Sequence, residues 1–190
     1  MKKNNRIWIY PFIAMGLLLI LNNSCKKDNS TSLVIGDSYQ GGIIAYIMQP
    51  GDPGYDANVQ HGFIAAPGDQ SSGIQWYNGS YTSTGALATA LGTGNVNTND
   101  IINSQDAGSY AAELCYDLEL SGYSDWYLPS KDELNELYIN KAAIGGFVGG
   151  FYWSSTEGSS NVAWFQGFSN GYQGAIGKNN SYYVRAVRTF

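Results

Sequence analysis

The first 25 residues indicate the compartment in which the rest of this chain must fold. Lys2, Lys3 and Arg6 precede an apolar run over residues 7–21, and Cys25 follows shortly after it. A basic head followed by an apolar segment of this length predicts a secretory signal. The run is shorter than the roughly 20 apolar residues that a membrane span needs. We therefore expect the folded part of the chain to work outside the cytoplasm.

The position of Cys25 predicts a bacterial lipoprotein signal over residues 1–24, cleaved so that Cys25 carries the lipid. Residues 25–33 then form the lipidated cysteine and a polar tether, and residues 34–190 form one domain. A plain secretory signal is the alternative, because residues 22–23 are both Asn, where a lipoprotein signal prefers an aliphatic and a small residue. The charged tripeptide directly after Cys25 resembles the export tag of surface-exposed Bacteroidetes lipoproteins. We expect an outer-membrane lipoprotein of the cell envelope.

Charge excludes one class of partner. Three of the ten Lys and Arg residues leave with the signal, so seven remain against fifteen Asp and Glu, a formal net charge of −8. Such a chain lacks the basic surface that nucleic acid requires. An acidic domain also has no attraction for anionic lipid, so we expect membrane contact through the lipid anchor alone.

Cysteine content decides how the domain is stabilised. With Cys25 lipidated, only Cys115 remains, and no intrachain disulfide can form. Ordinary core packing must hold the fold, and the chain carries fifteen Tyr, seven Phe and five Trp for this purpose. Its 24 Gly residues predict many tight turns between short strands.

The hydrophobic pattern predicts strands at both ends of the domain and helices between them. The expected strands cover residues 35–39, 43–47, 61–66, 74–77, 151–155, 162–168 and 182–188. Apolar residues at helical spacing predict a helix over 107–120, and residues 84–91 are expected to form a brief helix. Ser130 and Glu133 form a capping box that starts another helix. This order is typical of the α+β class.

Several phrases of the sequence resemble one family. Residues 122–134, Gly-Tyr-Ser-Asp-Trp-Tyr-Leu-Pro-Ser-Lys-Asp-Glu-Leu, are similar to a signature of the Lcl C-terminal-domain-like family, long catalogued as a domain of unknown function. Residues 152–157, Tyr-Trp-Ser-Ser-Thr-Glu, resemble its second element, and residues 163–164 and 183–188 resemble its last two. Tyr127 departs from the pattern, because the family usually has Arg there.

The resemblance implies a C-type-lectin-like fold, with two helices packed on a twisted antiparallel sheet. The family's founding member has a C-terminal adhesin domain that binds polyanionic glycans, a ligand that suits this acidic chain poorly. We therefore expect recognition of another glycan or of a surface protein. The alternatives are an accessory or degenerate relative of formylglycine-generating enzymes, or a structural envelope component. The enzymes depend on a C-terminal cysteine pair, and this chain has no cysteine after Cys115.

Chemistry-bearing residues are sparse, so we expect no enzyme. His61 is the only histidine and lies far in sequence from the serines of 154–155, which argues against a catalytic triad. A single histidine and a single cysteine besides the lipidated one also argue against zinc. We expect no cofactor, with calcium as the open alternative, since Asp52, Asp56 and residues 95–106 offer oxygen ligands without a defined loop spacing.

The segment 159–183 is the predicted ligand-binding surface. It combines rigid aromatic residues with Asn, Ser and Gly, a composition typical of binding surfaces. Trp164 and Phe168 are expected in the core, and Arg185 and Arg188 in structural ion pairs, with Glu133 as one candidate partner. The predicted ligand-binding residues are Asn161, Tyr172, Gln173, Asn179, Asn180 and Tyr182.

Overall fold

The computed structural model describes residues 32–190, which form one compact unit. The predicted signal peptide, Cys25 and most of the tether lie outside the described residues. No helix within 32–190 is both long and apolar enough to cross a membrane.

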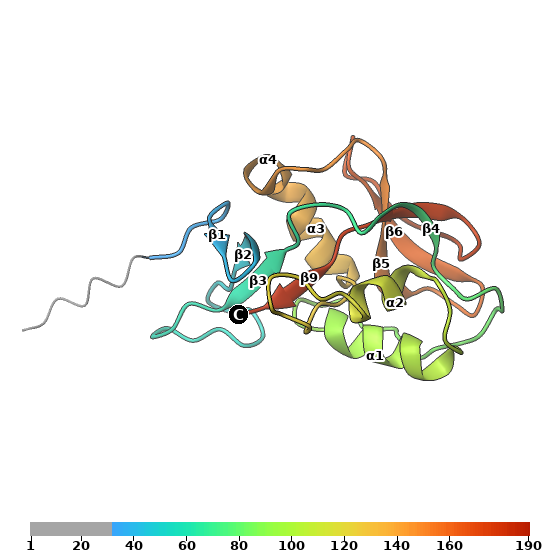
Figure 1. Ribbon diagram of the computed structural model, residues 1–190. Coiled ribbons are helices and arrows are strands. Elements are labelled where there is room, and N and C mark those ends of the chain that lie inside the picture. Colours follow the sequence, from blue (N-terminus) through green and yellow to red (C-terminus); the bar gives the residue numbers. More distant parts are fainter. Residues whose placement is uncertain (1–31) are drawn as a thin grey trace, which may run out of the picture. The chain divides into compact units, whose positions relative to one another are not determined.

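The domain is α+β, with two sheets and four helices among the described residues (Figure 1). The strands are β1 (Ser38–Tyr39), β2 (Gly42–Ile47), β3 (Gly62–Ala65), β4 (Ser71–Gln75), β5 (Phe151–Glu157), β6 (Val162–Gly167), β7 (Gln173–Gly177), β8 (Ser181–Val184) and β9 (Val187–Thr189). The helices are α1 (Gly94–Ser104), α2 (Ala111–Tyr116), α3 (Lys131–Ile139) and α4 (Lys141–Ile144).

The first sheet has the order β1-β2-β3-β9, and the second has the order β4-β8-β5-β6-β7. All pairings are antiparallel except that of β5 with β8, which is parallel. The segment predicted as one strand over 182–188 therefore contributes to both sheets, since β8 belongs to the second and β9 to the first. Residues Arg185 and Ala186 connect them.

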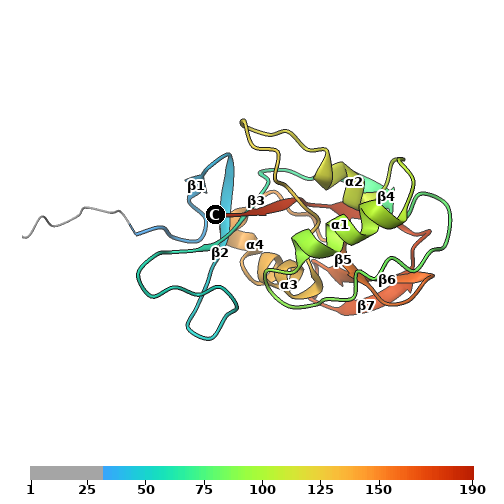
Figure 2. The ribbon, with the colours of Figure 1, turned by 90° about the horizontal axis from the view of Figure 1, so that it is seen from below.

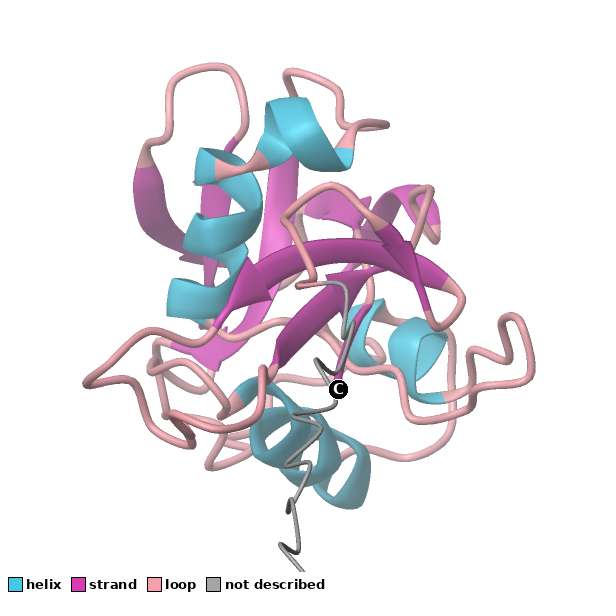
Figure 3. Ribbon diagram, turned by 90° about the vertical axis from the view of Figure 1, so that its left-hand side faces the viewer, coloured by secondary structure: helices cyan, strands magenta, loops and turns pink. Residues whose placement is uncertain are grey.

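The helices lie on opposite sides of the strands. The helices α1 and α2 pack in one core cluster and α3 and α4 in the other. Figure 1 shows α1 and α2 low in the picture and α4 at the top, and Figure 3 shows strands crossing between α3 and α4 in its upper half and α1 and α2 in its lower half. Successive side chains of β5 point to opposite faces of the sheet, so this strand contributes to both cores. Trp153 belongs to the core under α1 and α2, and Tyr152 belongs to the core under α3. The prediction of two helices on an antiparallel sheet was therefore too simple.

The capping box is confirmed. The Ser130 side chain accepts a hydrogen bond from the backbone N–H of Glu133, and the Glu133 carboxylate accepts one from the N–H of Ser130 at 2.8 Å. Leu134 and Leu137 form the buried face of α3.

Two helix predictions need correction. Residues 84–91 form no helix, because their backbone groups bond to other segments: the carbonyl of Ala88 accepts from Asn97, and that of Thr89 accepts from the N–H of Asp132. The helix expected over 107–120 is only α2. A turn with positive φ at Ser121 and Gly122 follows it, and the Glu113 carboxylate accepts from the N–H of Gly108 before it.

The sequence pattern did not predict one helix, α1, and one strand, β7. The sequence of α1 is poor in helix formers, and the helix is anchored by tertiary bonds, such as that from the N–H of Leu128 to the Thr98 hydroxyl at 3.1 Å. Strand β7 has the sequence Gln-Gly-Ala-Ile-Gly, whose glycines suggested a turn.

Candidate functional site

Four aromatic rings form a continuous row on the second sheet, on the side of α1 and α2. We call Phe151, Phe165, Tyr172 and Tyr182 the aromatic row. The Phe165 ring lies at its centre, with ring centroids 5.3 Å from Phe151, 6.0 Å from Tyr172 and 5.2 Å from Tyr182. Phe151 and Tyr182 also contact each other at 5.2 Å.

The row is buried at its centre and exposed at its ends. Phe165 is 8% exposed, whereas Phe151 is 45% and Tyr172 is 61% exposed. Two large apolar rings thus face solvent, held by a third ring between them. Exposed aromatic rings that contact one another are a feature that binding surfaces use.

Glycines make room for the exposed rings. A side chain at Gly174 would meet the Tyr172 ring at 2.9 Å, and one at Gly167 would meet the Phe151 ring at 3.2 Å. Both glycines lie in strands that pair with each other, β6 and β7. The high glycine content of this segment therefore has a local role, because it lets the Tyr172 and Phe151 rings lie close to the strand backbone.

The six residues predicted to bind ligand do not form one cluster. Tyr172 lies in the turn between β6 and β7, whereas Asn161 lies in the turn between β5 and β6, at the other end of β6. Asn179 and Asn180 lie in the turn after β7, close to Asn161, whose carbonyl accepts from the N–H of Lys178 at 3.0 Å. Only Tyr172 and Tyr182 belong to the aromatic row.

Four of these predicted residues have their side chains engaged. Asn161 accepts from the Ser159 hydroxyl at 2.6 Å, and Asn180 donates to the carbonyl of Gly177 at 2.9 Å. Tyr182 lies in β8, where a strand was expected from residue 182 onward, but its ring is half-buried, with its centroid 4.6 Å from that of Trp153. Burial raises the pKa of its phenol. The side-chain amide of Gln173 donates to the carbonyl of Lys131 and to the side-chain oxygen of Gln166, both at 3.0 Å. Phe151 is not among the six predicted residues, yet its ring is more exposed than that of Tyr182.

Of the two residues expected in the core, one is fully buried. Phe168 is 2% exposed, as predicted. Trp164 is only half-buried, and the Lys131 ammonium lies 5.1 Å from its ring centroid.

A buried ion pair lies behind the turns that carry Asn161 and Asn179. The Lys178 Nζ is 2.5 Å from Glu157 Oε1, and both side chains are at most 1% exposed. The Glu157 carboxylate also accepts from the N–H groups of Thr84 and Gly85, and the ammonium lies over the Trp76 ring. This cluster attaches the 82–86 loop to the second sheet, and sequence analysis missed it because its members are distant in the chain.

Both C-terminal arginines form ion pairs, as predicted. Arg185 Nε donates to Asp69 at 2.7 Å, and Arg188 makes a bidentate pair with Asp125 at 2.7 and 2.9 Å. The Arg188 guanidinium holds the pKa of Asp125 below its usual range. Glu133 is the partner of neither arginine.

Glu133 is buried without a cation. Its carboxylate accepts from the N–H groups of Ser130 and Gly92, at 2.8 Å each, and Tyr127 donates its phenol at 3.4 Å. Burial raises the pKa of Glu133 to about 7, although the amide donors act in the opposite direction. Burial also raises the pKa of Tyr127, at the position where the family usually has Arg.

The remaining reactive groups are separated from one another. Cys115 is buried and its pKa is raised by burial, and His61 Nδ1 lies 3.4 Å from the carbonyl of Phe190. Asp52 and Asp56 accept hydrogen bonds within their own turns, from Gln49 and Asn58. No three His, Cys, Asp or Glu residues within 32–190 lie close enough to hold a metal, and calcium stays an untested alternative.

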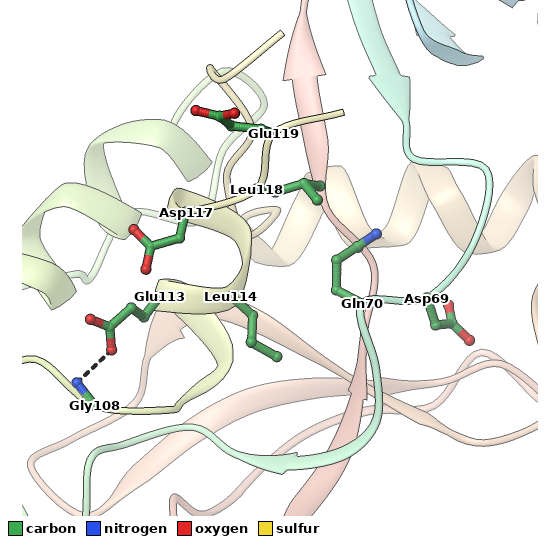
Figure 4. A pocket seen from close by; sticks show the side chains of 8 residues that line it. All are labelled: Asp69, Gln70, Gly108, Glu113, Leu114, Asp117, Leu118 and Glu119. Atoms are coloured by element: carbon green, nitrogen blue, oxygen red, sulfur yellow. Dashed lines mark hydrogen bonds between the residues drawn. The ribbon is translucent and has the colours of Figure 1, made fainter. Parts of the chain in front are cut away.

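A separate pocket of about 480 Å³ lies between α2 and the segment before β4 (Figure 4). Leu114 and Leu118 point into it opposite Gln70, while the carboxylates of Asp117 and Glu119 point away. None of the predicted ligand-binding residues lines it. Gln70 is already engaged, since its side-chain oxygen accepts from the N–H of Ala186 at 2.5 Å.

These features define an α+β domain with an exposed aromatic surface on its second sheet. The sequence profile of the Lcl C-terminal domain family matches residues 67–188. The chain belongs to this family, and the resemblance drawn from its motifs is confirmed. A comparison with curated proteins found no match.

Among solved structures, a fimbrial chain is similar over much of the present chain. It is a fimbrial protein from Bacteroides ovatus, 16% identical, with a TM-score of 0.48. The match covers 77% of the present chain, which spans 43% of the fimbrial chain. At this TM-score the likeness does not define the fold.

Proposed function

We propose that this protein is a recognition protein without enzymatic activity, and that it binds a glycan through the aromatic row. The observation that supports this most is the exposure of Phe151 and Tyr172 on either side of the supporting Phe165 ring. Sugar rings present C–H faces that pack on aromatic faces, and rigid rings bind at low cost in conformational entropy. A surface protein is the alternative ligand.

Polar groups beside the row suit this ligand. Asn170 is exposed, and its side-chain oxygen accepts from the N–H of Tyr172, which leaves its amide NH₂ for a ligand hydroxyl. Ser181 is exposed and directly precedes Tyr182. The formal net charge of −5 for the whole chain favours a neutral or cationic glycan over a polyanion.

As part of the same proposal, we infer that the fold is C-type-lectin-like and that the C-terminal strands carry the ligand surface. Family membership supports this, together with the placement of the row on β5, β6 and β8. A degenerate relative of formylglycine-generating enzymes is the alternative, and burial of Cys115 counts against a thiol-dependent activity.

The location in this proposal is the cell envelope. The N-terminal sequence supports export and a lipid on Cys25, and family membership is consistent with an envelope protein. Radiolabelled palmitate incorporated into the native chain, and lost in Cys25→Ala, tests the anchor.

The function is tested on a broad glycan array with residues 32–190, in calcium and in chelator. We expect binding that falls at least tenfold in Tyr172→Ala and Phe151→Ala. Tyr116→Ala is the matched control, because Tyr116 is 48% exposed at the end of α2 and lies outside the row. A loss in chelator would add calcium to the proposal.

Two results would contradict it. Equal losses of binding in Tyr172→Ala and Tyr116→Ala would show that the aromatic row is not the binding site. An array with no bound glycan would favour a surface protein as the ligand, or a structural role for the domain.

A further inference from the structure

The sheets of this domain have four edge strands, and three of them are protected against pairing. Strand β1 has two residues, and β4 is interrupted by an irregularity between Ser71 and Ile74. The outer edge of β9 is covered, because Val187 and Tyr127 exchange two backbone hydrogen bonds of 3.0 and 2.8 Å. Short, bulged or covered edges are the usual devices that prevent sheet extension.

Strand β7 has none of these devices. It pairs with β6 in an unbroken register over five residues, and its sequence contains no charge and no proline. It forms the edge of the second sheet, and Figure 2 shows it outermost beside β6. Ala175, at its middle, is exposed.

The hydrogen-bond alternation identifies the free backbone groups of β7. Gly167 donates to the carbonyl of Tyr172 at 2.8 Å, and Lys178 donates to that of Asn161 at 3.0 Å. Antiparallel pairs alternate, so residues 172, 174, 176 and 178 bond to β6, and residues 173, 175 and 177 point outward. The carbonyl of Gly177 accepts from Asn180. Within the described chain, the N–H and C=O groups of Gln173 and Ala175 have no other partner.

We propose that β7 pairs with β7 of a second copy of this chain, antiparallel about a two-fold axis at Gly174. This register places Gln173 opposite Ala175 of the second copy, and it pairs the N–H and C=O groups of these two residues on both strands in four hydrogen bonds. Tyr172 then lies opposite Ile176 of the second copy, in a pair without hydrogen bonds, where side chains approach most closely.

The exposed Tyr172 ring favours a second copy of this chain as the partner of β7. It is 61% exposed beside an edge of small residues, and Ile176 is half-buried on the same side of the sheet. Self-pairing places each of these side chains beside an apolar neighbour of the other copy and leaves the face of the sheet that carries the aromatic row open. An unrelated strand would need its own complementary residues. The contact is small by the standard of stable interfaces, so the dimer is weak and favoured where copies are concentrated.

The two-fold axis stands perpendicular to the joined sheet, so the aromatic rows of both copies lie on one side and adjoin. If the proposed function holds, the dimer presents two ligand sites together, and binding to a repeating glycan gains from bivalency. The dimer itself does not depend on that function.

Sedimentation equilibrium of residues 32–190, from micromolar to millimolar protein, tests the proposal. We expect the average mass to rise from that of a monomer toward twice that value. Ala175→Lys places a charge at the pairing edge, and Ala175→Pro removes only an outward N–H; both should stay monomeric. Ser72→Lys, on the bulged β4 edge, is the control and should behave as the parent.

A parent chain that stays monomeric at millimolar concentration overturns the proposal, as does an Ala175→Lys variant that dimerises like the parent. Circular dichroism establishes that each variant is folded. The glycan array separates this proposal from the proposed function, because monomeric Ala175→Lys should keep the affinity of a single site and lose only the bivalent gain.

Discussion

Two glutamates are buried in this domain, and they differ in what faces them. Glu157 has the Lys178 ammonium at 2.5 Å, whereas Glu133 has backbone N–H groups and the phenol of Tyr127. Each attaches a loop to the core: Glu157 binds the N–H groups of Thr84 and Gly85, and Glu133 that of Gly92. A buried carboxylate can therefore hold a loop with or without a cation, and burial raises the pKa of the one without a cation, Glu133, to about 7.

The largest expected effect comes from removing the cation. Lys178→Met leaves the Glu157 charge buried and unpaired, and should lower the free energy of unfolding by about 3–5 kcal/mol. Urea unfolding at pH 7 measures this. Lys131→Met is the control, because Lys131 is partly exposed and its ion pair with Asp132 is long, at 3.4 Å. Similar losses in the two variants would contradict a structural role for the buried pair.

The second effect concerns the unpaired carboxylate. Burial raises the pKa of Glu133 from 4.5 to about 7, so the folded state retains a proton that the unfolded chain releases. This stabilisation is complete below pH 4.5 and is lost as the pH rises to about 7, by roughly 3 kcal/mol. Urea unfolding of the parent and of Glu133→Gln across this range measures the difference. A constant difference would show that the amide donors offset burial.

A third experiment makes the two sites alike. Tyr127→Arg restores the residue usual in the family beside Glu133, and the guanidinium should lower the pKa of that carboxyl. The pH dependence should flatten by about 1–2 kcal/mol over the same range. Tyr127→Phe is the control, since it removes the phenol without adding charge. A slope in Tyr127→Arg equal to that of the parent would mean that the arginine points elsewhere.

The smallest effect is expected at a pair near the surface. The Asp125 side chain is 54% exposed, so Asp125→Asn should lower the free energy of unfolding by only about 0.5–1 kcal/mol at pH 7. The Arg188 guanidinium lowers the pKa of Asp125, so this stabilisation is present above the ordinary pKa and is lost as the pH falls through the lowered one. If Asp125→Asn lost as much free energy of unfolding as Lys178→Met, burial would not explain the difference between the exposed and the buried ion pair.

Local signals were read correctly from the sequence. The capping box needs only Ser130 and Glu133 three residues apart, and family membership needs only contiguous motifs, so both follow from short stretches of chain. The ion pairs of Arg185 and Arg188 were also predicted, because arginines within an apolar strand require partners.

Long-range contacts decided what the sequence could not. The chain at 84–91 has a composition suited to a helix, yet its backbone bonds to α1, to the start of α3 and to β5. The weakly helical residues of α1 are ordered by the same contacts, including those of Asn97 with Ala88. Tertiary hydrogen bonds thus outweighed local propensity in both segments.

The candidate site shows the same division. The amino-acid sequence alone shows that the C-terminal segment is rich in aromatic residues and glycine, and that Tyr172 belongs to it. Which rings meet depends on the fold of the whole chain, because β8 pairs with β5 although residues 158–180 separate the two strands, and this brings Tyr182 against Phe151. Periodicity assigns a residue to a face of a strand, but the order of strands, set by packing of the whole chain, decides which faces adjoin.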